Sequence, residues 1–155
     1  MGFSVSASAA IIFISFLLAL GALYVAWENS YSEVVSAKDY WYSLRLSQIN
    51  FKIGSISILP YNTTHVNLTF VFEGQTIPGN VDIIFNGIYS NSVDFNYLIP
   101  GDSYSLLFPG ADTSGNLNHV SLAFANGCQL IITYHYNGTN YVIDSSSTQC
   151  VMEVS

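Results

Sequence analysis

The feature that most constrains this chain is an uninterrupted run of 19 uncharged residues, 9–27, near the amino terminus. A helix of that length measures about 28 Å, close to the roughly 30 Å hydrocarbon core of a bilayer. Tyr24 and Trp27 lie at one end of the run, and aromatic rings favour the membrane–water interface. The run therefore predicts a transmembrane helix over residues 1–27, with Tyr24 and Trp27 as interface aromatics.

A cleaved secretion signal is the first alternative for this segment. Such a signal has a basic amino-terminal region, an apolar core of about 7–15 residues and a small-residue cleavage site. Here no charged side chain precedes Glu28, and Leu20-Gly21-Ala22 matches a cleavage site only loosely. We therefore expect a permanent anchor.

Residues 28–50 contain no proline or glycine. Tyr31, Val34, Trp41 and Ile49 recur at spacings compatible with one face of a helix. This pattern predicts that the helix continues to near residue 48, as a helical extension or linker between the anchor and the carboxy-terminal region.

The rest of the chain, 53–155, consists of short runs rich in β-branched and aromatic residues, separated by turn residues. The runs are SISIL, HVNLTFVF, VDIIFNGIY, SVDFNYLI, SYSLLF, HVSLAFA, CQLIITYHY, NYVID and TQCVMEV. The turn residues include Pro78-Gly79-Asn80, Pro100-Gly101-Asp102, Pro109-Gly110, Asn126-Gly127 and Asn137-Gly138. Seven to nine strands at this spacing predict a mostly β fold, an immunoglobulin-like antiparallel β-sandwich.

Charge is scarce and unevenly distributed. The basic side chains are Lys38, Arg45 and Lys52, and from Ile53 onward the chain has seven carboxylates and no Lys or Arg. Nucleic-acid and phosphate binding depend largely on Lys and Arg, so this region is a poor candidate for either, and we exclude nucleic acid. Acid denaturation arises mainly from protonating paired carboxylates. We therefore expect this domain to tolerate acid.

Two cysteines and three glycosylation motifs bear on the compartment. Cys128 and Cys150 can form a disulfide in an oxidising environment, the alternative being two buried free thiols. The candidate N-glycosylation sites are Asn62, Asn67 and Asn137. Lys38 and Arg45 follow the anchor, which by positive-inside counting favours a cytoplasmic domain. We give the cysteines, the motifs and the low charge more weight and expect the domain outside the cell.

No set of residues indicates catalysis or a metal centre. A copper site of the electron-transfer type needs two His, a Cys and a weak Met ligand. His65, His119 and His135 are dispersed, and Cys150 and Met152 have no His after them. The carboxylates are scattered mainly in turns, and no G-x-S-x-G motif occurs. We expect no metal, no cofactor and no enzymatic activity.

The opening Gly2-Phe3-Ser4-Val5-Ser6 runs directly into the apolar helix, followed by the extension WYSLRLSQINF and the β-domain. This arrangement resembles the crenarchaeal FlaF (ArlF) family of archaellum accessory proteins. The resemblance implies one membrane helix and an immunoglobulin-like domain beneath the S-layer. It also implies a stator role in archaeal motility, through binding of the S-layer protein, with FlaG as a partner and a homodimer formed through the sandwich. It implies no residue-level binding site.

An archaellin or pilin-like subunit, which polymerises through its amino-terminal helix, shares the same plan. Such subunits are made with a short leader that ends in a basic residue and glycine. In this sequence Gly2 directly follows Met1, so we expect no leader cleavage and favour the stationary anchor.

Overall fold

The computed structural model describes the backbone of residues 2–151 and the side chains of residues 7–151. The chain divides into two compact units, residues 1–43 and 44–155. The first unit is helical, and the second contains the last turns of that helix together with all the strands.

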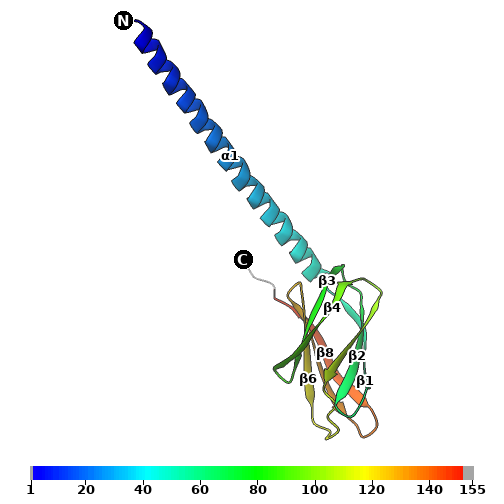
Figure 1. Ribbon diagram of the computed structural model, residues 1–155. Helices are drawn as coiled ribbons and strands as arrows, with labels where there is room; N and C mark the ends of the chain where they lie inside the picture. Colours follow the sequence, from blue (N-terminus) through cyan, green and yellow to red (C-terminus); the bar gives the residue numbers. More distant parts are fainter. Residues whose placement is uncertain (1, 152–155) are drawn as a thin grey trace. The chain divides into compact units, whose positions relative to one another are not determined.

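Helix α1 spans Gly2–Ile49 (Figure 1). It ends within one residue of the predicted position, since residues 9–50 offer the helix no proline and only Gly21 to weaken it. The part of α1 from Ala7 onward is long and apolar enough to cross a membrane. Inside this apolar stretch, the hydroxyl of Ser15 donates to the carbonyl of Ile11 at 2.9 Å, which satisfies the polar group within the helix.

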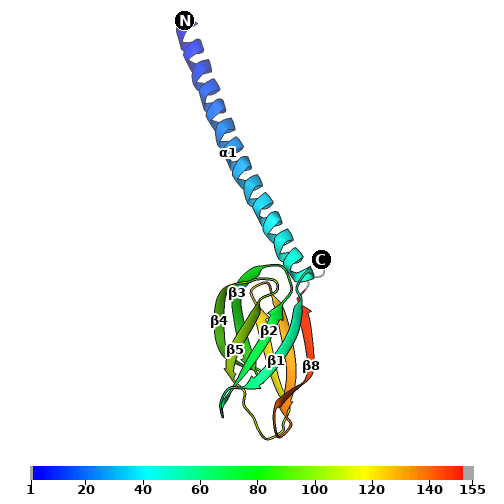
Figure 2. The ribbon, with the colours of Figure 1, turned by 90° about the vertical axis from the view of Figure 1, so that its right-hand side faces the viewer.

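Within the described residues, eight strands form two antiparallel sheets, whose arrangement can be followed in Figures 1 and 2. Sheet A has the order β1-β2-β5, and sheet B has the order β4-β3-β6-β7-β8. The strands are β1 (Ile53–Pro60), β2 (His65–Phe72), β3 (Ile77–Phe85), β4 (Ile88–Leu98), β5 (Ser103–Pro109), β6 (Asn118–Phe124), β7 (Cys128–Tyr136) and β8 (Tyr141–Cys150). The edges of the two sheets approach each other where β1 lies beside β8 and where β4 lies beside β5.

The strand order is that of an immunoglobulin-like sandwich with one additional strand. If β1, β2 and β5 are taken as strands A, B and E, then β4-β3-β6-β7 has the order C′-C-F-G. Strand β8 extends this second sheet beyond β7. The prediction of a mostly β sandwich behind one apolar helix is thus confirmed.

The core lies between the two sheets and follows from alternation along each strand. In β2, Val66, Leu68, Phe70 and Phe72 are fully buried, while the residues between them face outward. Facing them from sheet B are fully buried side chains of β3, β6 and β7: Val81, Ile83, Val120, Leu122, Ile132 and Tyr134. Burial of each large apolar side chain contributes about 1.5–3 kcal/mol, so this pattern decides which face of each strand points inward.

The predicted turn at Pro78-Gly79-Asn80 is wrong, because these residues lie within β3. The register with β4 shifts between Pro78 and Asn80, where β4 carries one extra residue. Asn96 in that bulge has a φ of 63°. A Cβ on Gly79 would lie 2.8 Å from the backbone nitrogen of Tyr97. Gly79 therefore serves close approach of two strands rather than a chain reversal.

Two further strand boundaries differ from the sequence pattern. The run VDIIFNGIY contains a turn at Asn86-Gly87, where both residues have positive φ, so it belongs to two strands, β3 and β4. Residues 141–144 of the run NYVID and residues 148–150 of the run TQCVMEV instead join into β8 through three polar serines, 145–147. Those serines are exposed and continue the strand because β7 supplies backbone partners along its length.

Candidate functional site

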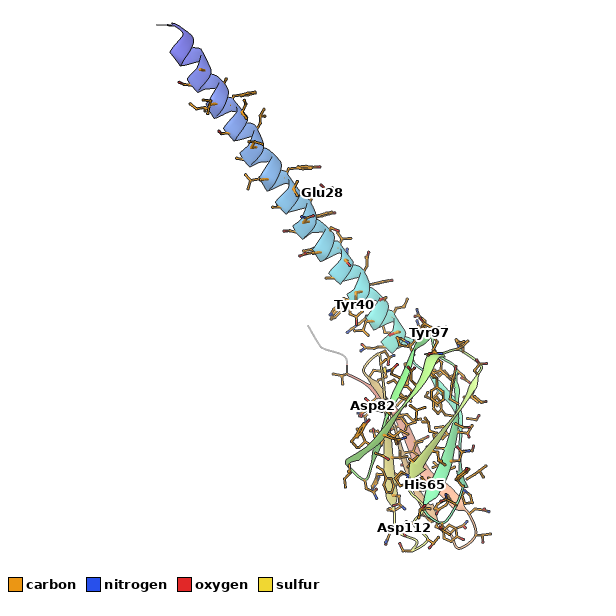
Figure 3. All side chains as sticks on the ribbon, viewed as in Figure 1. Glu28, Tyr40, His65, Asp82, Tyr97 and Asp112 are labelled. Carbon is orange, nitrogen blue, oxygen red and sulfur yellow. A yellow bond between two sulfur atoms is a disulfide. The ribbon has the colours of Figure 1, made fainter. Side chains whose placement is uncertain are left out.

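The sandwich has two ends of different character. The entry end, where the chain arrives from α1, comprises residues 47–52, the turn at Asn126-Gly127 and the ends of β2, β7 and β8. The far end comprises the turns 61–64, 86–87 and 137–140 and the loop 110–117. In Figure 3, His65 and Asp112 mark the far end, and Tyr97 lies toward the entry end.

At the entry end, the last turn of α1 is hydrogen-bonded to the β6–β7 turn. The side-chain amide of Gln48 donates to the carbonyl of Asn126 at 2.9 Å. In return, the amide of Asn126 donates to the carbonyl of Ser47 at 3.4 Å, and its oxygen accepts from the backbone N–H of Cys128 at 3.1 Å. Asn126 and Ser47 are buried. The end of the helix is therefore part of the sandwich.

A disulfide lies beside this contact. Cys128 and Cys150 face each other across β7 and β8 and are bonded, with their Cα atoms 4.0 Å apart. The sulfur of Cys150 lies 3.6 Å from the carbonyl oxygen of Gln48. An antibody domain places its disulfide between the sheets, whereas this one joins two strands of one sheet next to the end of the helix.

The chain then enters the core through Phe51. Its ring centroid lies 4.9 Å from that of Phe124 and 5.8 Å from that of Phe72, so one aromatic side chain touches both sheets. Next to it, the N–H of Glu73 donates to the carbonyl of Lys52 at 2.9 Å. The two side chains also form an exposed ion pair at 2.6 Å. Exposed pairs contribute little to stability, so the aromatic contacts dominate.

The outward surface of sheet A, called face A here, is uncharged. It consists of the outward residues of β1, β2 and β5: Ser57, Leu59, Asn67, Thr69, Val71, Ser103, Ser105 and Leu107, with His65 at the far end. All three strands are fully described, and none contains a carboxylate, a Lys or an Arg. The residues align in rows, one of them Leu59–Asn67–Leu107. Leu59 is 57% exposed and Leu107 is 40% exposed.

The outward surface of sheet B, called face B here, carries titratable groups. Asp82 and Asp94 lie exposed on β3 and β4, and His119 lies on β6. His135 on β7 contacts a carboxylate oxygen of Asp144 on β8 at 2.8 Å. Histidines and carboxylates change charge between neutral and acidic pH. Face B therefore carries both carboxylates and histidines, whereas face A carries no carboxylate and one histidine, His65, at its far end.

At the far end, a buried tyrosine forms a hydrogen bond to the loop between β5 and β6. The hydroxyl of Tyr134 donates to the carbonyl of Gly110 at 2.9 Å, and burial raises the pKa of this tyrosine. In the same loop, hydrogen bonds from the side chain and backbone of Ser114 lower the pKa of Asp112. The backbone bond is 2.8 Å long. These are turn and loop contacts, and they leave Asp112 half-buried.

The three glycosylation motifs occupy two kinds of backbone. Asn62 and Asn137 lie in exposed turns at the far end, and in each the side-chain oxygen accepts backbone N–H groups two and three residues ahead. Asn67 lies in the middle of β2, half-buried on face A. All three match the same sequence motif, and only the fold shows that they differ in backbone conformation and exposure.

The residues weighed for copper are not gathered into a site. Both cysteines are in the disulfide. His65 lies on sheet A, whereas His119 and His135 lie on face B. Met152 and Glu153 are outside the described residues. Within residues 7–151, no three His, Cys, Asp or Glu side chains are grouped closely enough to hold a metal ion.

The aromatics Tyr24 and Trp27 lie in α1 with exposed side chains. The contacts that sequence reasoning missed are those of Gln48 and Asn126. The Asn126-Gly127 pair signals a turn, but nothing in the sequence connects it to residue 48.

The chain matches no family model, no curated protein and no solved structure, so any function must be argued from its own geometry.

Proposed function

We propose that this protein is a non-catalytic, membrane-anchored component of the archaellum motor, similar to FlaF, that acts as a stator. In this proposal α1 spans the cell membrane, and the sandwich lies outside the cell, beneath the S-layer, and binds the S-layer protein. FlaG and a second copy of the chain are its further partners. The observation that most directly supports this proposal is the contact between the end of the helix and the sandwich.

A stator must transmit force between two attachments without yielding at the connection between them. Here the helix does not pass into the sandwich through a flexible glycine- or serine-rich segment. Its last turn is bonded to Asn126 and lies against the disulfide, and two residues after the helix ends Phe51 packs against the core. A flexible linker would behave as a random coil and transmit little torque. Residues 44–49 of the helix are thus part of the sandwich unit, and no such linker lies between them and the first strand.

The second attachment is assigned to face A. Surface ion pairs with carboxylates weaken as those carboxylates become protonated, so a contact that must persist in acid is best made without them. Face A offers hydroxyls and exposed leucines, and its strands contain no carboxylate. Face B carries Asp82, His119 and the His135–Asp144 pair. We therefore place the S-layer contact on face A.

The test is binding of the full-length protein, reconstituted in lipid nanodiscs, to purified S-layer protein at pH 3 and pH 7. The variants Leu59→Arg and Leu107→Arg put a permanent charge on face A, because arginine stays protonated at both pH values. Each is expected to weaken binding at least tenfold. The matched control is Ile88→Arg, since Ile88 is a 74% exposed apolar residue on β4, outside face A.

Equal losses from all three variants would contradict the assignment to face A but not the stator proposal. No binding by the unaltered protein at either pH would contradict the stator proposal itself. Filament formation by the intact protein under the same conditions would favour the alternative, a pilin-like subunit that polymerises through α1.

A further inference from the structure

We propose that Asn62 and Asn137 accept N-linked glycans on the folded domain and that Asn67 does not. This inference rests on the proposed extracellular location. The three motifs share the N-x-T pattern, and the structure separates Asn62 and Asn137 from Asn67 by backbone conformation and by exposure.

Asn62 has its amide held by the turn. Its oxygen accepts from the N–H of Thr64 at 2.9 Å, from the hydroxyl of Thr64 at 3.0 Å and from the N–H of His65 at 2.7 Å. All the hydrogen bonds that the described residues give to this side chain end on the oxygen. The carboxamide is planar, so the amide nitrogen points away from the turn. The hydroxyl of Thr64 also lies 2.8 Å from Nδ1 of His65, so the exposed turn, rather than an unbonded hydroxyl, is what presents the amide nitrogen of Asn62.

Asn137 repeats this arrangement in the β7–β8 turn. Its oxygen accepts from the N–H of Thr139 at 3.0 Å and from the N–H of Asn140 at 2.9 Å. Residues 137–140 are exposed. Gly138, at a φ of 93°, has open space where a Cβ would be. An approaching enzyme therefore meets a protruding turn at both sites.

Asn67 lies in the centre of a three-stranded sheet. It is paired with Leu59 of β1 on one side and with Leu107 of β5 on the other. The hydroxyl of its motif partner Thr69 is bonded to the hydroxyl of Ser105 at 2.9 Å. Bending residues 67–69 into a turn would break hydrogen bonds to both neighbouring strands. The folded chain cannot present this asparagine as it presents the other two.

The chemistry requires a membrane oligosaccharyl transferase and a lipid-linked oligosaccharide phosphate. The amide nitrogen of Asn62 or Asn137 attacks the anomeric carbon of the sugar, forming a C–N bond. The C–O bond to the lipid phosphate breaks, the lipid phosphate leaves, and the nitrogen loses one proton to a base of the transferase. No oxidation or reduction occurs.

Glycans confined to the two turns would leave face A open. Asn62 and Asn137 lie at the far end, whereas a glycan on Asn67 would stand between Leu59 and Leu107. An unmodified Asn67 keeps that row available for contact with a protein.

The experiment is mass spectrometry of the full-length protein purified from the membrane of its native host. The unaltered protein is expected to carry two glycans, mapped by peptide to Asn62 and Asn137. Asn62→Gln and Asn137→Gln should each remove one glycan mass, and Asn67→Gln should remove none. Thr64→Ala should abolish the glycan on Asn62 and Thr64→Ser should retain it. Thr69→Ala, the matched control, should leave the glycan pattern unchanged.

A glycan on Asn67, or none on Asn62 and Asn137, would overturn the inference. Protease added to intact cells distinguishes a failure of the glycosylation inference from a failure of the proposed extracellular location. Digestion of an unglycosylated domain would show that the location stands and the inference is wrong. Protection of an unglycosylated domain until the membrane is disrupted would show that both are wrong.

Discussion

The side-chain amide of Gln48 donates a hydrogen bond of 2.9 Å to the backbone carbonyl of Asn126, 78 residues further along the chain. This bond connects the last turn of α1 to the turn between β6 and β7. Residues from Leu44 onward belong to the same compact unit as the strands. The sandwich is therefore completed by a piece of helix, and stability measured on the domain should respond to substitutions there.

Asn126→Ala should destabilise the domain by about 2–3 kcal/mol, because it leaves the buried carbonyl of Ser47 and the N–H of Cys128 without partners. The measurement is denaturant unfolding of the full-length protein in detergent, followed by the circular dichroism of the sheets. The control is Asn80→Ala, since Asn80 is an exposed residue of β3. Its free energy of unfolding is expected to stay within about 0.5 kcal/mol of that of the unaltered protein. Equal effects of the two substitutions would contradict a specific role for Asn126.

Removing the disulfide should cost about 3 kcal/mol, since it closes a loop with a sequence separation of 22 residues. The double variant Cys128→Ser with Cys150→Ser, measured in the same way, should be less stable by that amount. Reductant should destabilise the unaltered protein and leave the double variant unaffected. If reductant shifted both equally, its effect would not come from this bond.

Alkali should destabilise the domain through Tyr134, whose pKa is raised by burial. In the unfolded chain a tyrosine ionises at about pH 10. The stabilising contribution of the neutral side chain is complete below that pH and is lost as pH rises toward the higher pKa of the folded state. Tyr134→Phe should lower stability at neutral pH by about 1 kcal/mol, through the lost bond to Gly110, and reduce the alkaline loss.

The control for this experiment is Tyr89→Phe, because Tyr89 is 61% exposed on β4. It should change neither the neutral stability nor the alkaline loss. An alkaline loss as large in Tyr134→Phe as in the unaltered protein would assign that loss to other tyrosines.

Acid should have a small effect on the domain. Among the described residues from Lys52 onward, the carboxylate pairs with basic side chains are the exposed Lys52–Glu73 pair and the His135–Asp144 contact, and exposed pairs contribute little to stability. The melting temperature at pH 3 should lie within about 8 °C of that at pH 7, equivalent to about 1 kcal/mol. Collapse of the fold at pH 3 would contradict this expectation and remove the argument for a contact face that works in acid.

Asp112 should supply part of the small acid effect. Its pKa is lowered by the hydroxyl and the N–H of Ser114. A carboxyl with a depressed pKa stabilises the fold above its unfolded pKa, about 3.9, and that stabilisation is lost as pH falls through the folded value. Asp112→Asn should therefore show a flatter profile of stability against pH below pH 4 than the unaltered protein, measured by denaturant unfolding.

Much of the fold could be predicted from local pattern. The apolar helix, its end near residue 49 and the strands β2 and β7 follow from composition and periodicity alone. The predicted strand boundaries were wrong where pairing with a neighbouring strand, rather than local sequence, determines the backbone conformation. Pro78-Gly79-Asn80 has turn chemistry but is held in β3 by the bulge of β4, and the serines of β8 are ordered by β7.

The sequence by itself determined that this chain has one long apolar helix and a charge-poor set of short strands, because those properties depend on residues close together along the chain. Only the tertiary structure decided which residues meet. Gln48 reaches Asn126 and Cys128 joins Cys150 because the strands are brought into register by burial of the core. The same packing leaves face A without a carboxylate, gathers Asp82, Asp94 and Asp144 on the other sheet, and places Asn67 in a sheet but Asn62 and Asn137 in turns. Contacts between residues far apart in sequence depend on that packing, and no local pattern encodes them.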